Sequence, residues 1–177
     1  MQGEIVAFEG PSGSGKSYHL AIWESEGYRV LRRTPSPRVN TNGFGAWSSA
    51  GHEYTAIAAA TMEPDVPVFV DRFLLSRWVY RALQFNRGVL TDEWQFEMIR
   101  SLRRMLSTAS NDKADRMYAA PGLYPKITIN VLLPSLEVLY MQRRASGKEY
   151  PFDAEQELTL YHEVSLLQSN LYKVNIL

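Results

Sequence analysis

The sequence predicts an α/β domain of three layers, in which helices cover both faces of a five-stranded parallel sheet. Five short runs rich in β-branched and aromatic residues alternate with longer stretches of helical spacing, at residues 5–8, 28–31, 66–70, 127–133 and 172–177. Several of the runs are continuously apolar, which is typical of strands buried on both faces. Alternation of strand and helix favours parallel pairing of the strands.

Length and composition favour a single domain that spans residues 1–177. The chain has 177 residues, of which 45% are apolar, enough for one substantial core. Nineteen basic side chains balance nineteen acidic ones, so no basic excess favours tight binding to duplex nucleic acid or anionic membranes. The absence of cysteine excludes disulfides, thiolate zinc sites and cysteine nucleophiles.

No segment is predicted to enter a membrane or to direct secretion. The apolar runs fall far short of the roughly 20 residues that a membrane-spanning helix needs. The first residues, Met1-Gln2-Gly3-Glu4, carry neither a basic flank nor a long apolar stretch. We therefore expect no membrane partner and a cytoplasmic location, which is the host cytoplasm if a phage encodes the protein.

Spacing and stop signals define six helices. The first is expected to begin within residues 15–17 and to end at Gly27, and the second to cover 53–62 before Pro64. A third runs from Phe73 to about residue 88, and a fourth, capped by Thr91, carries an apolar stripe at Trp94, Met98, Leu102 and Met105. The last two cover 135–144 and 153–167. Residues 34–51 form the longest predicted loop, and such loops are usually functional.

A phosphate-binding motif follows the first predicted strand. Residues 10–17, Gly10-Pro11-Ser12-Gly13-Ser14-Gly15-Lys16-Ser17, match G-x-x-x-x-G-K-[ST] at every fixed position and open a helix. The glycines let backbone N–H groups turn towards phosphate oxygens, and the helix N-terminus adds partial positive charge. Lys16 is expected to reach the β and γ phosphates of ATP, and Ser17 to hold Mg²⁺. No guanine-reading Asn-Lys-x-Asp segment occurs, so a small kinase is favoured over a GTPase.

An acidic and a basic residue follow the third predicted strand. Asp71 and Arg72 come directly after the apolar run 66–70, at the edge of the sheet where ligands of parallel α/β folds bind. Asp71 is a candidate Mg²⁺ ligand, or the general base if the acceptor is a hydroxyl. The planar guanidinium of Arg72 suits a phosphoryl group. The alternative is a helix-capping aspartate with a surface arginine.

In these motifs and in several others the sequence resembles the thymidylate kinase family. Phe8-Glu9-Gly10 resembles the family's entry to its loop, and Asp71-Arg72-Phe73 with Ser76 and Tyr80 is similar to its Asp-Arg-Tyr segment. Arg87-Gly88 with Trp94, and the stretch 122–126, resemble later family motifs. Arg143, Arg144 and Lys148 resemble the basic lid that closes over the donor, here about residues 143–152. The resemblance implies a P-loop kinase fold, ATP with Mg²⁺, and a homodimer.

The departures from the family all lie on the acceptor side. The family's acidic loop residue is Ser12 here, Arg33-Thr34-Pro35-Ser36 replaces Arg-Glu-Pro-Gly, Arg81 replaces a glutamine, and 53–62 contains no arginine. The chain also ends soon after the last predicted strand, without the family's terminal helix. These changes leave the acceptor open.

The sequence leaves three alternative functions for the chain. The first is transfer of the ATP γ-phosphoryl group to a pyrimidine deoxynucleotide, in which Lys16, Asp71, Arg72, Arg143 and Arg144 act on the transferring group. The second is phosphorylation of the hydroxyl of 5-hydroxymethyluracil within DNA, as the resemblance to a phage branch implies, with Arg32, Arg33, Arg38, Phe44 and Trp47 near the strand. The third is a nucleotide-binding switch without turnover, in which a basic lid would have little purpose.

Overall fold

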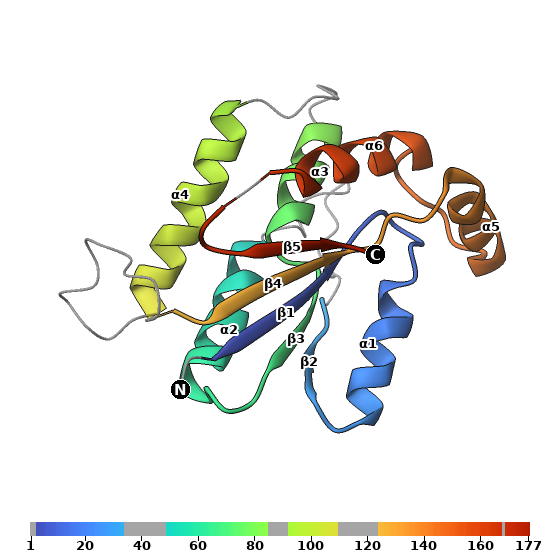
Figure 1. The fold of residues 1–177 in the computed structure, drawn as a ribbon. Coiled ribbons are helices and arrows are strands. Elements are labelled where there is room, and N and C mark those ends of the chain that lie inside the picture. Colours follow the sequence, from blue (N-terminus) through green and yellow to red (C-terminus); the bar gives the residue numbers. More distant parts are fainter. Residues whose placement is uncertain (1–2, 34–48, 85–91, 110–123, 168) are drawn as a thin grey trace.

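The computed structural model describes residues 3–33, 49–84, 92–109, 124–167 and 169–177. Strands and helices alternate along the chain (Figure 1), and their bounds are β1 (Glu4–Glu9), α1 (Lys16–Ser25), β2 (Arg29–Leu31), α2 (Ser49–Met62), β3 (Val68–Asp71), α3 (Leu74–Gln84), α4 (Asp92–Ala109), β4 (Lys126–Val131), α5 (Leu136–Ser146), α6 (Ala154–Ser165) and β5 (Lys173–Ile176). The predicted α/β class with five strands is confirmed.

The five strands form one parallel sheet in the order β2-β3-β1-β4-β5. The first strand is therefore central, between β3 and β4. In the pairing of β1 with β3, Phe8 lies beside Asp71, so the residues that follow the two strands emerge next to each other. Neighbouring strands whose connections leave in different directions open a crevice at their carboxyl ends, which is the usual ligand site of such folds.

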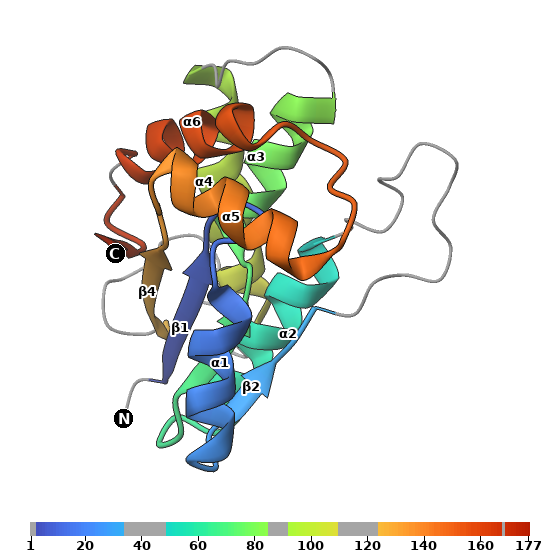
Figure 2. The ribbon, with the colours of Figure 1, turned by 90° about the vertical axis from the view of Figure 1, so that its right-hand side faces the viewer.

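Helices cover both faces of the sheet, as the continuous apolar strands predict (Figures 1 and 2). Because side chains alternate along a strand, Ile5 and Ala7 of β1 belong to the larger core, which also contains residues of α2, α3, α4 and α6. Phe8 faces the other way and packs with Leu20 of α1, Phe69 and Leu132 in a smaller core. The predicted three-layer arrangement is thus confirmed.

Most of the predicted helix limits agree with the structure within a few residues. Gly27 follows α1 with φ 87°, a left-handed conformation that glycine adopts without steric cost. Ser135 caps α5 by accepting a hydrogen bond from the Val138 amide, and Asp153 caps α6 in the same way. The second helix begins at Ser49, four residues before the predicted start. The predicted ends around Arg87–Gly88 and Thr91 lie outside the described residues.

The predicted stripe on α4 is confirmed at Met98 and Leu102, and Leu106 extends it. Met98, Leu102 and Leu106 are buried, whereas Met105 is only partly buried against the same core. The side chain of Trp94 lies outside the described residues. Met98, Leu102 and Leu106 are spaced four residues apart and therefore lie on one face of α4. This face is the most continuously apolar one, and it packs against α2 and α3. Within the described helices, none is both long and apolar enough to cross a bilayer.

Replacement of Leu102 by alanine should lower the free energy of unfolding by about 2–5 kcal/mol, because loss of its fully buried side chain leaves a cavity in the larger core. Urea denaturation followed by circular dichroism measures the change. Arg103→Ala, on the exposed side of the same helix, should stay within about 0.5 kcal/mol of the parent. Equal midpoints for the two variants would show that α4 is not part of the cooperative core.

Candidate active site

The loop 10–15 connects β1 to α1, in the place that the phosphate-binding motif requires. Gly10 has φ 136°, and a Cβ built on it would lie 2.5 Å from the carbonyl oxygen of Leu132. Only glycine fits both the conformation and the close approach. Gly15, with φ 89° and ψ 4°, directly precedes the first turn of α1. The loop therefore delivers Lys16 and Ser17 at a helix N-terminus, where the helix dipole favours anions.

The ammonium group of Lys16 is buried and folded back onto its own loop. Its Nζ donates to the carbonyl oxygens of Gly10, at 3.0 Å, and Pro11, at 2.7 Å, and to Oγ of Ser14, at 3.1 Å. Burial lowers the pKa of Lys16 well below its usual value, and the nearby Arg72 guanidinium lowers it further, while Asp71 opposes both. An anion placed in the loop would offset the cost of burying this charge.

Ser17 and Asp71 offer two oxygen ligands beside the loop. Ser17 is exposed in the first turn of α1, and Asp71 ends the neighbouring strand β3. If Mg²⁺ binds, these two oxygens would hold it together with water and nucleotide phosphates, which usually supply the other ligands of Mg²⁺. Within the described residues no three acidic or histidine side chains group into a complete metal site.

Arg72 lies against the loop in a backbone conformation that is rare for its residue type. Its φ is 62°, and its amide donates to the carbonyl oxygen of Phe8 in β1 at 3.0 Å. The guanidinium donates from Nη1 to Gly10 O, at 3.1 Å, and to Oη of Tyr161, at 2.7 Å, and from Nη2 to Oγ of Ser12, at 3.2 Å. The side chain is therefore aimed at the loop rather than at bulk solvent.

Arg143, the first residue of the predicted lid, is buried against the loop. Its Nε donates to the carbonyl oxygen of Ser12 at 2.9 Å, and its Nη1 to that of Phe152 at 2.8 Å. Its guanidinium also covers the ring of Tyr150 and pairs with Glu157, with 3.2 Å between Nη2 and Oε1. The two ends of the segment 143–152 are thus fastened around this one side chain.

Arg144 and Lys148 do not join this cluster. Both side chains are exposed, and Arg144 lines a shallow hollow on the outer side of α5 with Tyr140 and Met141. In the described contacts neither group touches the loop. Arg32 points away as well, since it pairs with Glu24 at 2.6 Å on the surface. Of the other acceptor-side predictions, Arg38, Phe44 and Trp47 lie outside the described residues.

Two buried carboxylates complete the site, and neither was predicted. Glu9 accepts hydrogen bonds from the amides of Phe73, Leu75 and Ser76 and from the Ser76 hydroxyl, so β1 caps the start of α3. Burial raises the pKa of Glu9 in spite of these donors. Glu157 of α6 accepts from the Ser12 amide at 2.6 Å and from the Tyr80 hydroxyl at 3.0 Å. Burial raises the pKa of Tyr80 to about 12, so its hydroxyl remains a donor at neutral pH.

Sequence signals for both carboxylates exist. Glu9 is an ionisable residue at the end of an otherwise apolar strand. Glu157 lies on the buried face of α6, three, four and seven residues before Leu160, Tyr161 and Val164. A charged residue on an apolar helical face is rare unless it is paired. The position of Glu157 matters chemically, because it places an acid beside the Ser12 amide of the loop.

Arg33 and His52 lie near Arg72 and Asp71. Arg33 is half-buried, and its burial, together with the charge of Arg72, lowers its pKa to about 10. The ring Nε2 of His52 lies 3.2 Å from the carbonyl oxygen of Asp71, and burial lowers the pKa of this ring. Three cationic groups, Lys16, Arg33 and Arg72, therefore surround the end of β3. Cationic groups gathered in this way favour the binding of an anion such as phosphate.

Comparison with known proteins gives a fold and no closer relationship. No family model matches the chain, and no curated protein matches its sequence. Solved structures do match. One is the YorR protein of Bacillus subtilis in complex with phosphorylated GDP, which is 20% identical with a TM-score of 0.56. The match covers 98% of this chain and 84% of the YorR chain. Deoxyadenosine kinase from M. mycoides matches in two structures. With bound dATP it is 12% identical, with a TM-score of 0.53, and the match covers 97% of this chain and 89% of the kinase. With bound dCTP the identity is 15% and the TM-score 0.51, and the match covers 98% of this chain and 89% of the kinase. The chain therefore has the fold of the P-loop nucleoside and nucleotide kinases.

Nucleotide binding should be coupled to proton uptake in the alkaline range. Burial lowers the pKa of Lys16, and the negative charge of bound phosphates should raise it, so between the lowered and the ordinary value of about 10.4 binding should add up to one proton. Calorimetry at about pH 9 in buffers of different ionisation enthalpy measures this number. Lys16→Arg, which does not titrate there, should take up none. Equal uptake by the two proteins would assign the proton to another group.

Proposed function

We propose that the chain is an ATP-dependent kinase that transfers the γ-phosphoryl group to a pyrimidine deoxynucleotide, as the resemblance to thymidylate kinases implies. The observation that carries the proposal is the convergence of Lys16, Asp71 and Arg72 on one loop at the end of β1 and β3. Phosphoryl transfer needs little from a protein beyond positioning and charge stabilisation, and this cluster offers both. The proposal includes a cytoplasmic setting and a homodimer.

The residues have separate roles in the proposed transfer. Lys16 exchanges the loop carbonyls for the β and γ phosphates, while the loop amides hold the donor at the N-terminus of α1. Ser17 and Asp71 hold Mg²⁺, which offsets the charge of the phosphates when it is bound. Arg72 stabilises the transferring group and binds the acceptor.

The proposed lid acts through Arg143. This side chain donates to the loop through the carbonyl of Ser12, and its charge is shared with Glu157. To approach the γ-phosphoryl group, Arg143 exchanges Glu157 for a phosphate oxygen when the segment 143–152 closes. Arg144 enters the proposal as a second lid residue that turns inwards in the same movement.

A second candidate keeps the donor chemistry and changes the acceptor to the hydroxyl of 5-hydroxymethyluracil in DNA. The departures on the acceptor side favour it, since Ser12 stands where the thymidylate kinase family has an acidic loop residue. A hydroxyl acceptor loses a proton during transfer, and Asp71 is the candidate base. The deoxyadenosine kinase fold makes a free deoxynucleoside a third acceptor worth including in the test.

Transfer from γ-labelled ATP with Mg²⁺ tests these acceptors together. The panel contains free monophosphates, deoxynucleosides, and DNA with thymine or 5-hydroxymethyluracil. We expect label on a pyrimidine deoxynucleotide, and Lys16→Ala should lower its rate by about 100-fold or more, because a charge that acts on the transferring group is lost. Label on modified DNA alone would support the second candidate. Bound ATP without label on any acceptor would favour a switch.

The Asp71→Asn variant distinguishes a role of Asp71 as a Mg²⁺ ligand from a role as the general base. If the acceptor is a phosphate, the variant should lose about 100-fold in rate and regain part of it at high Mg²⁺, because the amide still offers one oxygen. Rates measured across Mg²⁺ concentration and pH give the answer. A loss that no Mg²⁺ concentration reverses, with a flattened pH profile, would instead assign the base role and a hydroxyl acceptor. Asp65→Asn, an exposed aspartate in the turn before β3, is the matched control.

A further inference from the structure

Two rows of hydrogen bonds lead from the guanidinium of Arg72 to buried carboxylates, and the first row ends at Glu9. Nη1 of Arg72 donates to Oη of Tyr161 at 2.7 Å, and this oxygen lies 2.7 Å from Oγ of Ser76. The hydroxyl of Ser76 donates to Oε2 of Glu9. Because the single proton of Ser76 goes to Glu9, the hydroxyl of Tyr161 donates to Ser76. Every hydroxyl proton in this row therefore has an acceptor.

The second row passes through the phosphate loop and ends at Glu157. Nη2 of Arg72 donates to Oγ of Ser12 at 3.2 Å, and this oxygen lies 3.0 Å from Oη of Tyr80. The hydroxyl of Tyr80 donates to Oε2 of Glu157, also at 3.0 Å. Because this uses the single proton of Tyr80, the hydroxyl of Ser12 donates to Tyr80. We call the two sets of contacts the Glu9 row and the Glu157 row.

The Glu9 row and the Glu157 row have the same construction. In each, one terminal nitrogen of Arg72 is followed by two hydroxyls and a carboxylate, and a tyrosine supplies one of the hydroxyls. Tyr80 belongs to α3 and Tyr161 to α6, and these two helices pack against each other (Figures 1 and 2). Both tyrosines and both carboxylates are at most 2% exposed. The guanidinium is therefore held at both terminal nitrogens by groups that have almost no contact with water.

The backbone of Arg72 is a separate sign that this residue is held in place. Its φ of 62° is an unfavourable conformation for a residue with a Cβ, and such conformations persist only where the surrounding contacts enforce them. Strained residues of this kind cluster at ligand sites, where they fix a side chain in advance. Arg72 therefore combines an enforced backbone with a guanidinium that is held at both ends.

Charge and burial strengthen the two rows. Hydrogen bonds donated by an ionised group are about twice as strong as neutral ones, and successive hydroxyls that donate in the same direction polarise one another. Burial raises the pKa of Tyr161 well above its usual value and that of Tyr80 to about 12. Both hydroxyls therefore keep their protons at neutral pH, and the direction of donation in each row is fixed.

We propose that Tyr161 and Tyr80 are positioning residues for Arg72. Their hydroxyls hold the two terminal nitrogens of its guanidinium at the phosphate loop, so that the rate of phosphoryl transfer depends on both hydroxyls through Arg72. The inference rests on the proposed transfer reaction and adds two residues that need not touch a nucleotide. A displacement of about 1 Å in a group that acts on the transferring phosphoryl costs up to about 100-fold in rate.

A double-mutant cycle with Arg72 separates positioning from a general structural role. Tyr161→Phe should lower kcat by about tenfold, because one terminal nitrogen of Arg72 loses its acceptor, and should leave the Kd for ATP within about twofold. In the Arg72→Ala protein, adding Tyr161→Phe should change the remaining rate by no more than about twofold. Thermal melting shows that each variant is folded. Equal losses with and without Arg72 would overturn the proposal.

The guanidinium of Arg72 can also be observed without any reaction. In nitrogen-15 NMR spectra of the full chain, a held guanidinium gives separate signals for its terminal nitrogens, whereas free rotation averages them. Arg72, assigned by the loss of its signals in Arg72→Lys, should give separate signals in the parent and averaged ones in Tyr161→Phe and Tyr80→Phe. Averaged signals in the parent, or separate ones in both variants, would overturn the proposal. Separate signals lost in the variants, without transfer to any acceptor, would support the positioning and count against the transfer function.

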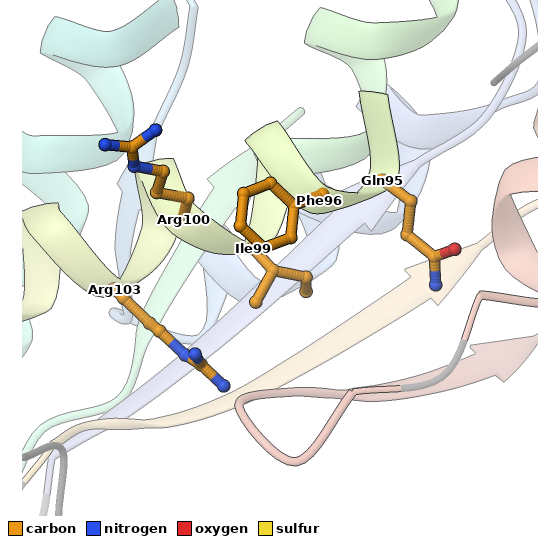
Figure 3. Close-up of a pocket in the computed structure, with 5 residues that line it drawn as sticks. All are labelled: Gln95, Phe96, Ile99, Arg100 and Arg103. Carbon is orange, nitrogen blue, oxygen red and sulfur yellow. The ribbon is translucent and has the colours of Figure 1, made fainter. Parts of the chain in front are cut away.

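Arg103 is the internal reference for a guanidinium that rotates freely. Figure 3 shows its side chain extending from α4 at the edge of a hollow, and the residue is exposed. Its terminal nitrogens should give averaged signals in the parent and in every variant.

Tyr172→Phe is the matched control for the loss of a buried tyrosine hydroxyl. Tyr172 is 7% exposed, and its hydroxyl has no hydrogen-bond partner in the described part of the chain. Removing a hydroxyl of this kind is nearly neutral, so kcat and the Arg72 signals should stay as in the parent. A loss in Tyr172→Phe as large as that in Tyr161→Phe would assign the effect to general loosening of the core and overturn the proposal.

Discussion

The parallel pairing of β1 with β3 is the constraint on which the site depends. Because Phe8 lies beside Asp71 in this register, the phosphate loop and the Asp71–Arg72 segment leave the sheet at the same point. The amide of Arg72 then bonds to Phe8, and the amides at the start of α3 bond to Glu9. One strand thus sets the position of the loop that follows it and of the helix beside it. A shift of register would separate Lys16 from Asp71.

Burial of charge is the second organising feature. Lys16, Glu9, Glu157 and Arg143 are all less than about a tenth exposed, and each is paired or hydrogen-bonded. Removing one member of such a set leaves the others buried without compensation, which is far more costly than losing a surface pair. The cluster therefore supports the loop while no nucleotide is bound. Ser12 lies at the centre of this cluster, where it contacts Tyr80 of α3, Glu157 of α6 and Arg72.

The basic side chains around the loop share one setting. Lys16, Arg33, Arg72 and Arg143 lie around the loop and are at least half-buried. On the neighbouring helices, Arg77 of α3 pairs with the buried Glu53 of α2, one residue from His52, which contacts Asp71. Contacts of α2 and α3 therefore reach the end of β3 where the loop lies.

The sequence by itself determined the α/β class, the loop 10–17 and the strand-end pair Asp71–Arg72, because these depend on local spacing, on glycine conformation and on apolar runs. Only the tertiary structure decided which distant groups meet there. Glu157 reaches Ser12 across 145 residues, and Arg143 turns inwards while Arg144, its neighbour, stays exposed. Helix spacing predicts that adjacent residues face different ways, but not which of them faces the loop. That choice depends on how α5 and α6 pack over the sheet, and it is a property of the whole chain.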